Sequence, residues 1–188
     1  MRAAEPVEAG SLVLHEFGAG YEVFGEPDAP AVLLLPTWQI VHSRIWKMQV
    51  PFLARAFRVI TFDMPGNGNG ERTTDPAAFE YVRVSRQALG VLDHLDIERA
   101  SLVGYSRSCA YCIWLAATEP ERVERVVASG DDADRAAESR ERFLQFGTPL
   151  LRSRKGELLG HPFGAASLEV TDAGLESSRG RLCAGQLA

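Results

Sequence analysis

The chain has few of the features that mark secreted, membrane-spanning or nucleic-acid-binding proteins. Its three cysteines cannot all pair with one another, which argues against a disulfide framework and fits a reducing compartment. The apolar runs, such as residues 31–35, are far too short to cross a bilayer. The formal net charge of -5 gives no reason to expect nucleic acid or an anionic membrane as partner. Residues 1–10 lack the basic and apolar regions of a signal peptide, so the sequence predicts a cytoplasmic protein.

The apolar residues that are present, 46% of 188, are sufficient for one domain with a core. From residue 31 onward, apolar runs alternate with helical patterns, which is typical of βαβ units in an α/β fold with a parallel sheet. Strands are expected at residues 11–17, 21–24, 31–35, 58–63, 101–105 and 123–128, and helices at 51–57, 76–95 and 109–118. Glycines 18 and 20 predict the turn of a first hairpin. The apolar face of the long helix is predicted by Val82, Leu89 and Leu92, beside Ala88 and Leu95.

This pattern predicts a division of the chain into three parts. Residues 1–10 are expected to form a flexible N-terminus, and residues 11–146 a single α/β domain. Residues 147–188 contain no apolar run typical of a buried parallel strand, so we expect an irregular or disordered tail. The strand at 123–128 would then be an exposed edge of the sheet.

The residues most indicative of chemistry are Gly104-Tyr105-Ser106, where an apolar strand meets an apolar helix. A strand, a sharp turn and a helix form the context of a nucleophile elbow, which raises one side chain above the sheet. The positions two before and two after that side chain must be small, as Gly104 and Ser108 are. Ser106 is therefore a candidate nucleophile. The alternative is an ordinary strand-to-helix turn in which Ser106 or Ser108 caps the helix.

Further motifs occur in a fixed order around this turn. They are Tyr-Glu-Val-Phe-Gly at 21–25, Asp-Met-Pro-Gly-Asn-Gly at 63–68, the Gly-Tyr-Ser turn, and Glu-Pro-Glu-Arg-Val at 119–123. Together they resemble the α/β-hydrolase superfamily, in its branch of small esterases, lactonases and C–C bond hydrolases. The resemblance covers residues 11–130 and implies a mostly parallel sheet with flanking helices. It also implies an oxyanion hole formed by the backbone N–H groups of Trp38 and Arg107.

Three departures from the family pattern stand out. Pro36-Thr37 replaces the usual His-Gly before the oxyanion residue, and Ser108 replaces a glycine. The residues after Gly130 do not match the family's lid and C-terminal strands. A truncated relative, or a chain that needs a partner to complete its sheet, is therefore an alternative to a complete hydrolase.

A serine hydroxyl needs a histidine to take its proton and a carboxylate to orient that histidine. The chain order in this fold is Ser, acid, His, and His161 is the histidine that follows Ser106. Its Gly-His-Pro-Phe setting resembles that of the family's catalytic histidine, and Asp132 is the first candidate for the acid. Two observations favour another interpretation. The aspartates at 131, 132 and 134 suit a helix N-terminus, and residues 150–159 are too charged for the strand that should precede the histidine.

Two other motifs have a second interpretation. The glycine-rich residues 66–70 do not open directly into a helix, as a dinucleotide-binding loop would, and the preceding Asp63 favours the hydrolase loop. Cys109 and Cys112 have the spacing of a redox pair, but small buried residues on a helix are the better interpretation. We expect no cofactor and no metal site.

The sequence thus supports two functions. The first is a serine hydrolase of a small ester, thioester or lactone, with Ser106 as nucleophile, Asp132 and His161 as its partners, and Trp38 and Arg107 at the oxyanion. The second is a catalytically inactive relative that binds a small ligand or is vestigial. In both, the expected partner is a small molecule, without nucleic acid or membrane, and the sequence sets no oligomeric state.

Overall fold

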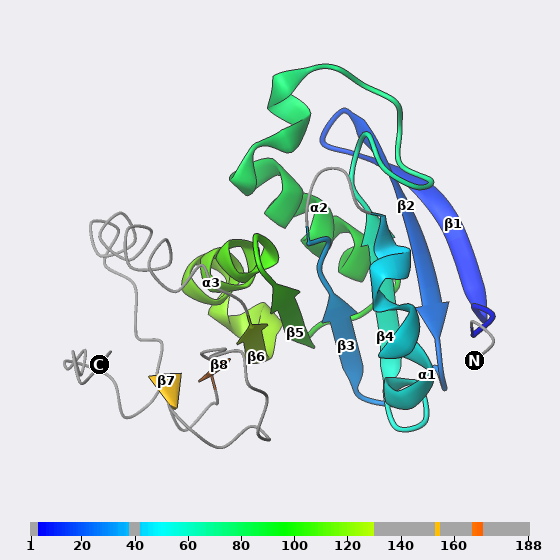
Figure 1. Cartoon of the computed structure of the whole chain (residues 1–188), viewed down its shortest axis with the longest axis vertical. Coiled ribbons are helices and arrows are strands. Elements are labelled where there is room, and N and C mark those ends of the chain that lie inside the picture. The colour runs from blue at the N-terminus through cyan, green and yellow to red at the C-terminus, as the bar shows by residue number, and fades with distance from the viewer. Residues whose placement is uncertain (1–3, 38–41, 130–152, 155–166, 171–188) are drawn as a thin grey trace.

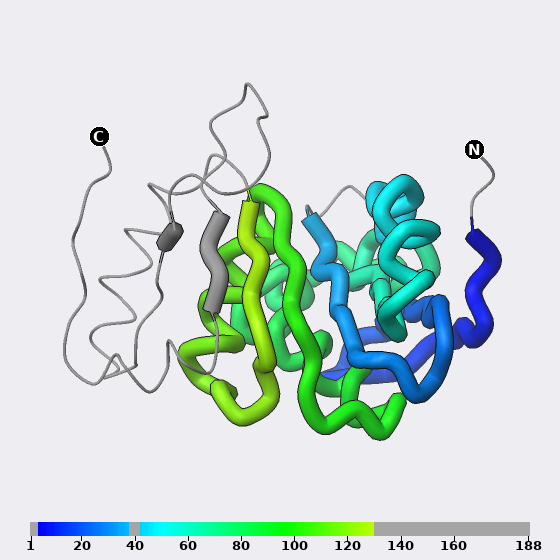
Figure 2. Tube along the Cα trace, turned by 90° about the horizontal axis from the view of Figure 1, so that it is seen from below, coloured from blue at the N-terminus to red at the C-terminus, as the bar shows by residue number. Residues whose placement is uncertain are grey.

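A mixed sheet forms the centre of the computed structural model, which describes residues 4–37, 42–129, 153–154 and 167–170 (Figure 1). The strands of the described residues are β1 (Glu8–Leu14), β2 (Phe17–Phe24), β3 (Ala31–Leu34), β4 (Arg58–Asp63), β5 (Ala100–Tyr105), β6 (Val123–Ser129), β7 (Ser153–Arg154) and β8 (Ser167–Val170). Their order is β1-β2-β4-β3-β5-β6-β8-β7. The four central strands are parallel, and β3, β5 and β6 lie side by side in Figure 2. The expected α/β fold with a mostly parallel sheet is confirmed.

Helices cover both faces of this sheet. They are η1 (Ser43–Met48), α1 (Val50–Leu53), η2 (Pro76–Phe79), α2 (Tyr81–His94), α3 (Ser108–Thr118) and η3 (Pro120–Arg122). Helices α2 and α3 pack on one face, where the larger apolar cluster includes Leu33, Ile60, Leu102 and Tyr111. On the other face, η1 and α1 cover a smaller cluster with Leu34 and Val59. Figure 1 shows α1 in front of β4 and α2 behind the sheet. The β3 segment (AVLL) is apolar throughout, and β4 is mostly so, because both of their faces are covered.

The first hairpin is present, but its predicted turn at residues 18–20 is wrong. The turn is His15-Glu16, and both residues have positive φ (51° and 75°), as a two-residue hairpin turn requires. Gly18 and Gly20 lie inside β2 instead. A Cβ at Gly20 would lie 2.5 Å from the Asn69 Cβ. Glycine is needed at position 20 because a loop distant in sequence passes this close to the strand. Residues 8–10 were expected to belong to a flexible N-terminus but are part of β1, which begins at Glu8.

The long helix also differs from the prediction. Residues 76–79 form the separate η2, because Glu80 has extended backbone angles (φ -66°, ψ 140°) that interrupt the helix. Val82 was expected on the apolar face of α2 but is 40% exposed. The buried face begins at Val84 and includes Ala88, Val91 and Leu92, so Ala88 and Leu92 were placed correctly on it and Val82 was not.

The edge of the sheet beyond β6 is also not as expected. Strand β8 pairs antiparallel with β6 over Val126–Ala128, so the prediction of an exposed edge there is wrong. Strand β7 in turn pairs with β8. Both short strands lie within residues 147–188, the range expected to be irregular. The sequence pattern did not reveal them because short antiparallel edge strands need no continuous apolar run.

Candidate functional site

Ser106 lies in the turn between β5 and α3 with a φ of 56°, in the left-handed region. A non-glycine residue there costs on the order of 1–3 kcal/mol and persists only where the surroundings enforce it. The Ser106 N–H donates to the Ser129 carbonyl at 2.8 Å, which holds the turn against the end of β6. None of the described residues is a hydrogen-bond partner of the Ser106 hydroxyl. The positive φ of Ser106, between a strand and a helix, is compatible with the expected nucleophile elbow.

The positions that flank Ser106 meet the size requirement in different ways. A Cβ on Gly104 would lie 2.7 Å from the Ser108 carbonyl oxygen and 2.8 Å from the Cys112 Sγ, so only glycine fits. Ser108 is fully buried. Its Oγ donates to the Tyr105 carbonyl at 2.9 Å and accepts from the Tyr105 N–H at 2.7 Å. A serine is therefore accommodated where the family pattern has glycine.

The geometry at the start of α3 is compatible with an oxyanion hole. Arg107 immediately precedes α3, and no acceptor among the described residues meets its backbone N–H. The second expected donor, Trp38, lies outside the described residues. The backbone that leads to it is described up to Thr37. The Leu35 N–H donates to the Val103 carbonyl at 3.0 Å, which continues the β3–β5 pairing and brings this segment to the end of β5.

Asp132 and His161, the expected acid and histidine, both lie outside the described residues. The three remaining histidines have other environments. His15 forms the β1–β2 turn, His42 Nδ1 accepts from the Arg44 N–H at the start of η1, and His94 Nε2 lies 3.1 Å from the Tyr21 hydroxyl. None of these contacts involves the elbow.

Asp63 organises the loops at the same edge of the sheet. Its buried carboxylate accepts from the Ser43 N–H at 2.6 Å and from the Asn69 N–H at 3.0 Å. It thereby fastens the start of η1 to the loop after β4. Gly68 (φ 44°) passes so close that a Cβ would lie 1.9 Å from the Asp63 Oδ2. The Asp-x-Pro-Gly-x-Gly pattern therefore marks a structural carboxylate and its loop, and not a phosphate cradle.

An arginine between two tyrosines lies beside the elbow, and the sequence analysis did not find it. The Arg107 Nε donates to the Tyr111 hydroxyl at 3.1 Å. The guanidinium carbon lies 4.6 Å from the ring centroid of Tyr81, and the two tyrosine rings are 5.2 Å apart. Burial raises the pKa of Tyr111, and Arg107 opposes that shift only in part. Arg107 and Tyr111 are four residues apart, a spacing at which helical side chains meet, so the sequence indicates their contact. Tyr81 is distant in sequence, and no local pattern indicates that it meets them.

Cys109 and Cys112 are buried thiols. The Cys109 Sγ lies 3.4 Å from the Ser129 carbonyl oxygen, and Cys112 packs beneath Gly104. Burial raises the pKa of the Cys112 thiol well above its usual value, so the thiolate that redox exchange requires is disfavoured. These residues are part of the core beneath the elbow.

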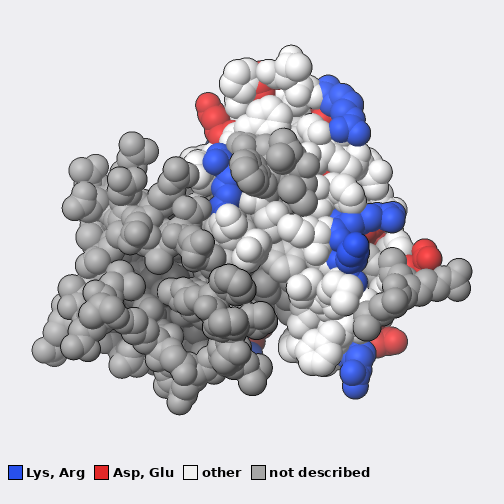
Figure 3. Space-filling model, viewed as in Figure 1, with Lys and Arg blue, Asp and Glu red and all other residues white. Residues whose placement is uncertain are grey.

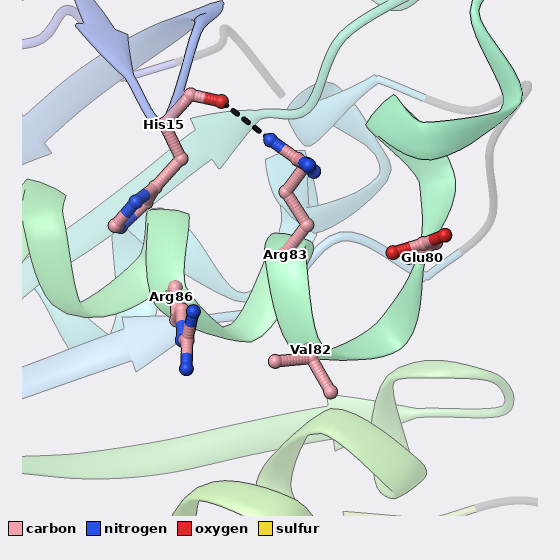
Figure 4. A pocket seen from close by; sticks show the side chains of 5 residues that line it. All are labelled: His15, Glu80, Val82, Arg83 and Arg86. Atoms are coloured by element: carbon pink, nitrogen blue, oxygen red, sulfur yellow. Dashed lines mark hydrogen bonds between the residues drawn. The ribbon is translucent and has the colours of Figure 1, made fainter.

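A shallow hollow of about 120 Å³ lies elsewhere, between the β1–β2 turn and the start of α2 (Figure 4). His15, Arg83 and Arg86 line it. Arg83 donates to the His15 carbonyl at 2.8 Å and stacks 5.2 Å from the ring centroid of Phe17, so it fastens the hairpin to α2. The hollow does not include the elbow, and we assign it a structural role.

Two further properties of the described residues bear on partners. No three His, Cys, Asp or Glu side chains among them gather closely enough to hold a metal ion. No helix among them has the length and apolar content needed to cross a membrane. On the face drawn in Figure 3, basic and acidic side chains are scattered among uncharged ones.

Comparison with known proteins places this geometry in context. A 2-hydroxymuconate semialdehyde hydrolase from Pseudomonas sp. (strain CF600) is 39% identical over 118 residues, which are 62% of this chain and 38% of that protein. A 3-oxoadipate enol-lactonase 2 from Acinetobacter baylyi is 25% identical over 123 residues, or 65% of this chain and 45% of that protein. A crystal structure of a hydrolase from Pseudomonas aeruginosa PA01 matches with a TM-score of 0.60 and 28% identity, over 73% of this chain and 52% of that one.

The chain therefore spans less than half the length of these two curated relatives. The model of the alpha/beta hydrolase fold nevertheless matches residues 30–176, most of the chain, in agreement with the strand order. This chain belongs to the α/β-hydrolase fold family.

Proposed function

We propose that this protein is a serine hydrolase that cleaves a small ester, thioester or lactone, with Ser106 as nucleophile. The observation that carries the proposal is the φ of 56° at Ser106, enforced by Gly104 and by the Ser129 carbonyl. Strain of this kind is retained where it serves a purpose, and here it lifts one hydroxyl above the carboxyl end of β5. The Arg107 N–H, in the same turn, meets no acceptor among the described residues.

In the proposed reaction, the Ser106 Oγ attacks the substrate carbonyl carbon while His161 accepts the hydroxyl proton. Asp132 orients His161 and stabilises its positive charge. The N–H groups of Trp38 and Arg107 stabilise the negative oxygen of the tetrahedral intermediate. The C–O or C–S bond then breaks, and the leaving group takes the proton from His161. Water releases the acid from Ser106 by the same steps, and no cofactor is needed.

The relatives support a hydrolase over the inactive alternative. The two curated relatives named above are a hydrolase and a lactonase, and the inactive alternative receives no support from the comparisons. The proposed oxyanion donors are backbone groups, which a side-chain change at Ser108 leaves in place. The departure at Pro36-Thr37 acts on the backbone instead, because proline and threonine restrict φ and ψ more than glycine does.

The test is covalent labelling of the purified, folded chain with a fluorophosphonate probe. Labelling is expected in the native sequence and is expected to be lost in Ser106→Ala and strongly slowed in His161→Ala. Ser101→Ala, in β5, is the matched control and should label normally. Absence of labelling in the folded native chain would favour the inactive alternative. Labelling that survives His161→Ala would place the base elsewhere.

A further inference from the structure

Arg107 is held rigidly next to the proposed nucleophile. Its Nε is fixed by the Tyr111 hydroxyl, and the face of its guanidinium lies over Tyr81. Arginine side chains on surfaces usually lose considerable conformational entropy when they bind a ligand. Here the two tyrosines have already ordered the side chain, so a ligand would meet a guanidinium that is oriented in advance.

The charge of Arg107 is not neutralised within the described part of the chain. No described carboxylate lies within ion-pair distance of it, whereas Arg122, for example, is paired with Asp93. Its hydroxyl partner Tyr111 is fully buried, and burial raises the pKa of this tyrosine, so the phenol stays neutral at physiological pH. The two terminal nitrogens have no hydrogen-bond acceptor among the described residues. The planar N–H fork that binds carboxylates is therefore available.

The position of the cluster is that of a ligand site in this class of fold. Arg107 follows the carboxyl end of β5, and Tyr81 begins α2, the helix that follows β4. Ligands of open α/β sheets bind at the carboxyl ends of the strands. Tyr81 is 41% exposed and Arg107 is only partly buried, so solvent and ligand can reach the cluster.

The geometry points to Arg107 as the residue that selects substrates carrying a carboxylate close to the scissile carbonyl. This inference rests on the proposed function, because Ser106 defines where the scissile carbonyl lies. A carboxylate would accept two parallel N–H bonds from the terminal nitrogens, while Nε stays bound to Tyr111. The substrate class is thus an acidic ester, thioester or lactone, and a neutral analogue would leave the guanidinium without its counter-charge.

The test compares monomethyl glutarate with dimethyl glutarate, which differ in one carboxylate. Binding is measured by calorimetry on the Ser106→Ala chain, so that no turnover intervenes. We expect the monoanion to bind roughly tenfold to a hundredfold more tightly, the range for a hydrogen bond to a charged group. The further substitution Arg107→Gln should abolish this preference, and Arg107→Lys should retain only part of it, because an ammonium cannot reproduce the fork. Arg86→Gln, which removes the same charge from exposed α2, should leave the preference intact.

Equal binding of the two esters to the parent chain would overturn the inference. A preference that survives Arg107→Gln, or that Arg86→Gln abolishes equally, would also do so. If the Arg107→Gln variant does not fold, the inference is tested by two results instead. They are the preference of the Ser106→Ala chain for the monoanionic ester and the reduction of that preference in Arg107→Lys. Hydrolysis of monomethyl glutarate by the chain with Ser106 intact is measured separately. Tighter binding of monomethyl glutarate without its hydrolysis would count against the proposed function but would still support the carboxylate site at Arg107.

Discussion

The Ser108 hydroxyl bonds both backbone polar groups of Tyr105, accepting from its N–H at 2.7 Å and donating to its carbonyl at 2.9 Å. The two residues flank Ser106 and Arg107, so this pair closes the turn from beneath. The proposed oxyanion donor, Arg107, and the proposed nucleophile, Ser106, thus lie in a turn whose ends are bonded to each other. The serine that departs from the family pattern has a structural use of its own.

Ser108→Ala should destabilise the fold by about 1–2 kcal/mol, because it leaves two partly buried backbone groups of Tyr105 without the Ser108 hydroxyl as partner. Urea denaturation gives the free energy of unfolding. Thr118→Ala is the control. It also removes one side-chain bond, to the Trp114 carbonyl, but at an exposed position on the same helix, and should change stability little. Equal losses in the two variants would contradict the role given to Ser108.

Ser106→Gly should yield a protein about 1 kcal/mol more stable than Ser106→Ala, since only glycine adopts a φ of 56° without steric cost. Both variants lack the nucleophile, so neither should label with fluorophosphonate. At Ser101 in β5 the order should be reversed: Ser101→Gly should be less stable than Ser101→Ala, because glycine weakens a strand. An alanine variant at 106 as stable as the glycine variant would mean that the turn is not strained.

The local features of the fold could be predicted from the sequence, and the long-range ones could not. The apolar runs of β3 and β4 and the Gly-Tyr-Ser turn were identified correctly, because two-sided burial and tight turns leave direct marks on sequence. The first hairpin was misplaced because Gly18 and Gly20 resemble turn residues. They are glycines because residues 69 and 71 pack against them: the Gly18 N–H donates to the Glu71 carboxylate at 2.7 Å. Such contacts leave no local signal.

The same distinction applies to the site. Gly104 and Ser106 are neighbours in sequence, so their relation was evident before the structure. Tyr81 meets Arg107 only because α2 and α3 pack together on one face of the sheet. The expected triad partners Asp132 and His161 lie outside the described residues and remain predictions.

Asp63→Asn should lower the free energy of unfolding by about 2 kcal/mol. The carboxylate accepts one backbone N–H at each oxygen, and an asparagine would turn an NH₂ group toward one of those donors. Because these bonds fasten two loops at the edge of the sheet where Ser106 lies, labelling of Ser106 by fluorophosphonate should slow as well. Asp75→Asn serves as the control. This exposed aspartate caps η2 through the Ala77 N–H, and asparagine caps equally well, so neither stability nor labelling should change. Labelling at the native rate in Asp63→Asn would show that the elbow does not depend on these loops.

Stability should fall as the pH rises above about 8.5, and Cys112 should account for part of the fall. Burial raises the pKa of its thiol well above the usual value, and Cys109 adds to this. In the unfolded chain the thiol ionises near about 8.5. Above that pH the unfolded state releases a proton that the folded state keeps, so ionisation favours unfolding; below it both states are protonated and the stability is complete.

Urea denaturation from about pH 7 to 9.5 under reducing conditions tests this, in a Cys183→Ser background so that the buried pair supplies the remaining thiols. Cys112→Ala lowers stability at every pH because it leaves a cavity, so the quantity to compare is the slope of stability with pH. The alanine variant should lose stability less steeply above about pH 8.5, since it has no thiol at 112 to ionise on unfolding. Identical slopes would mean that the Cys112 thiol already reaches water in the folded state, and that the core beneath Gly104 is looser than its packing indicates.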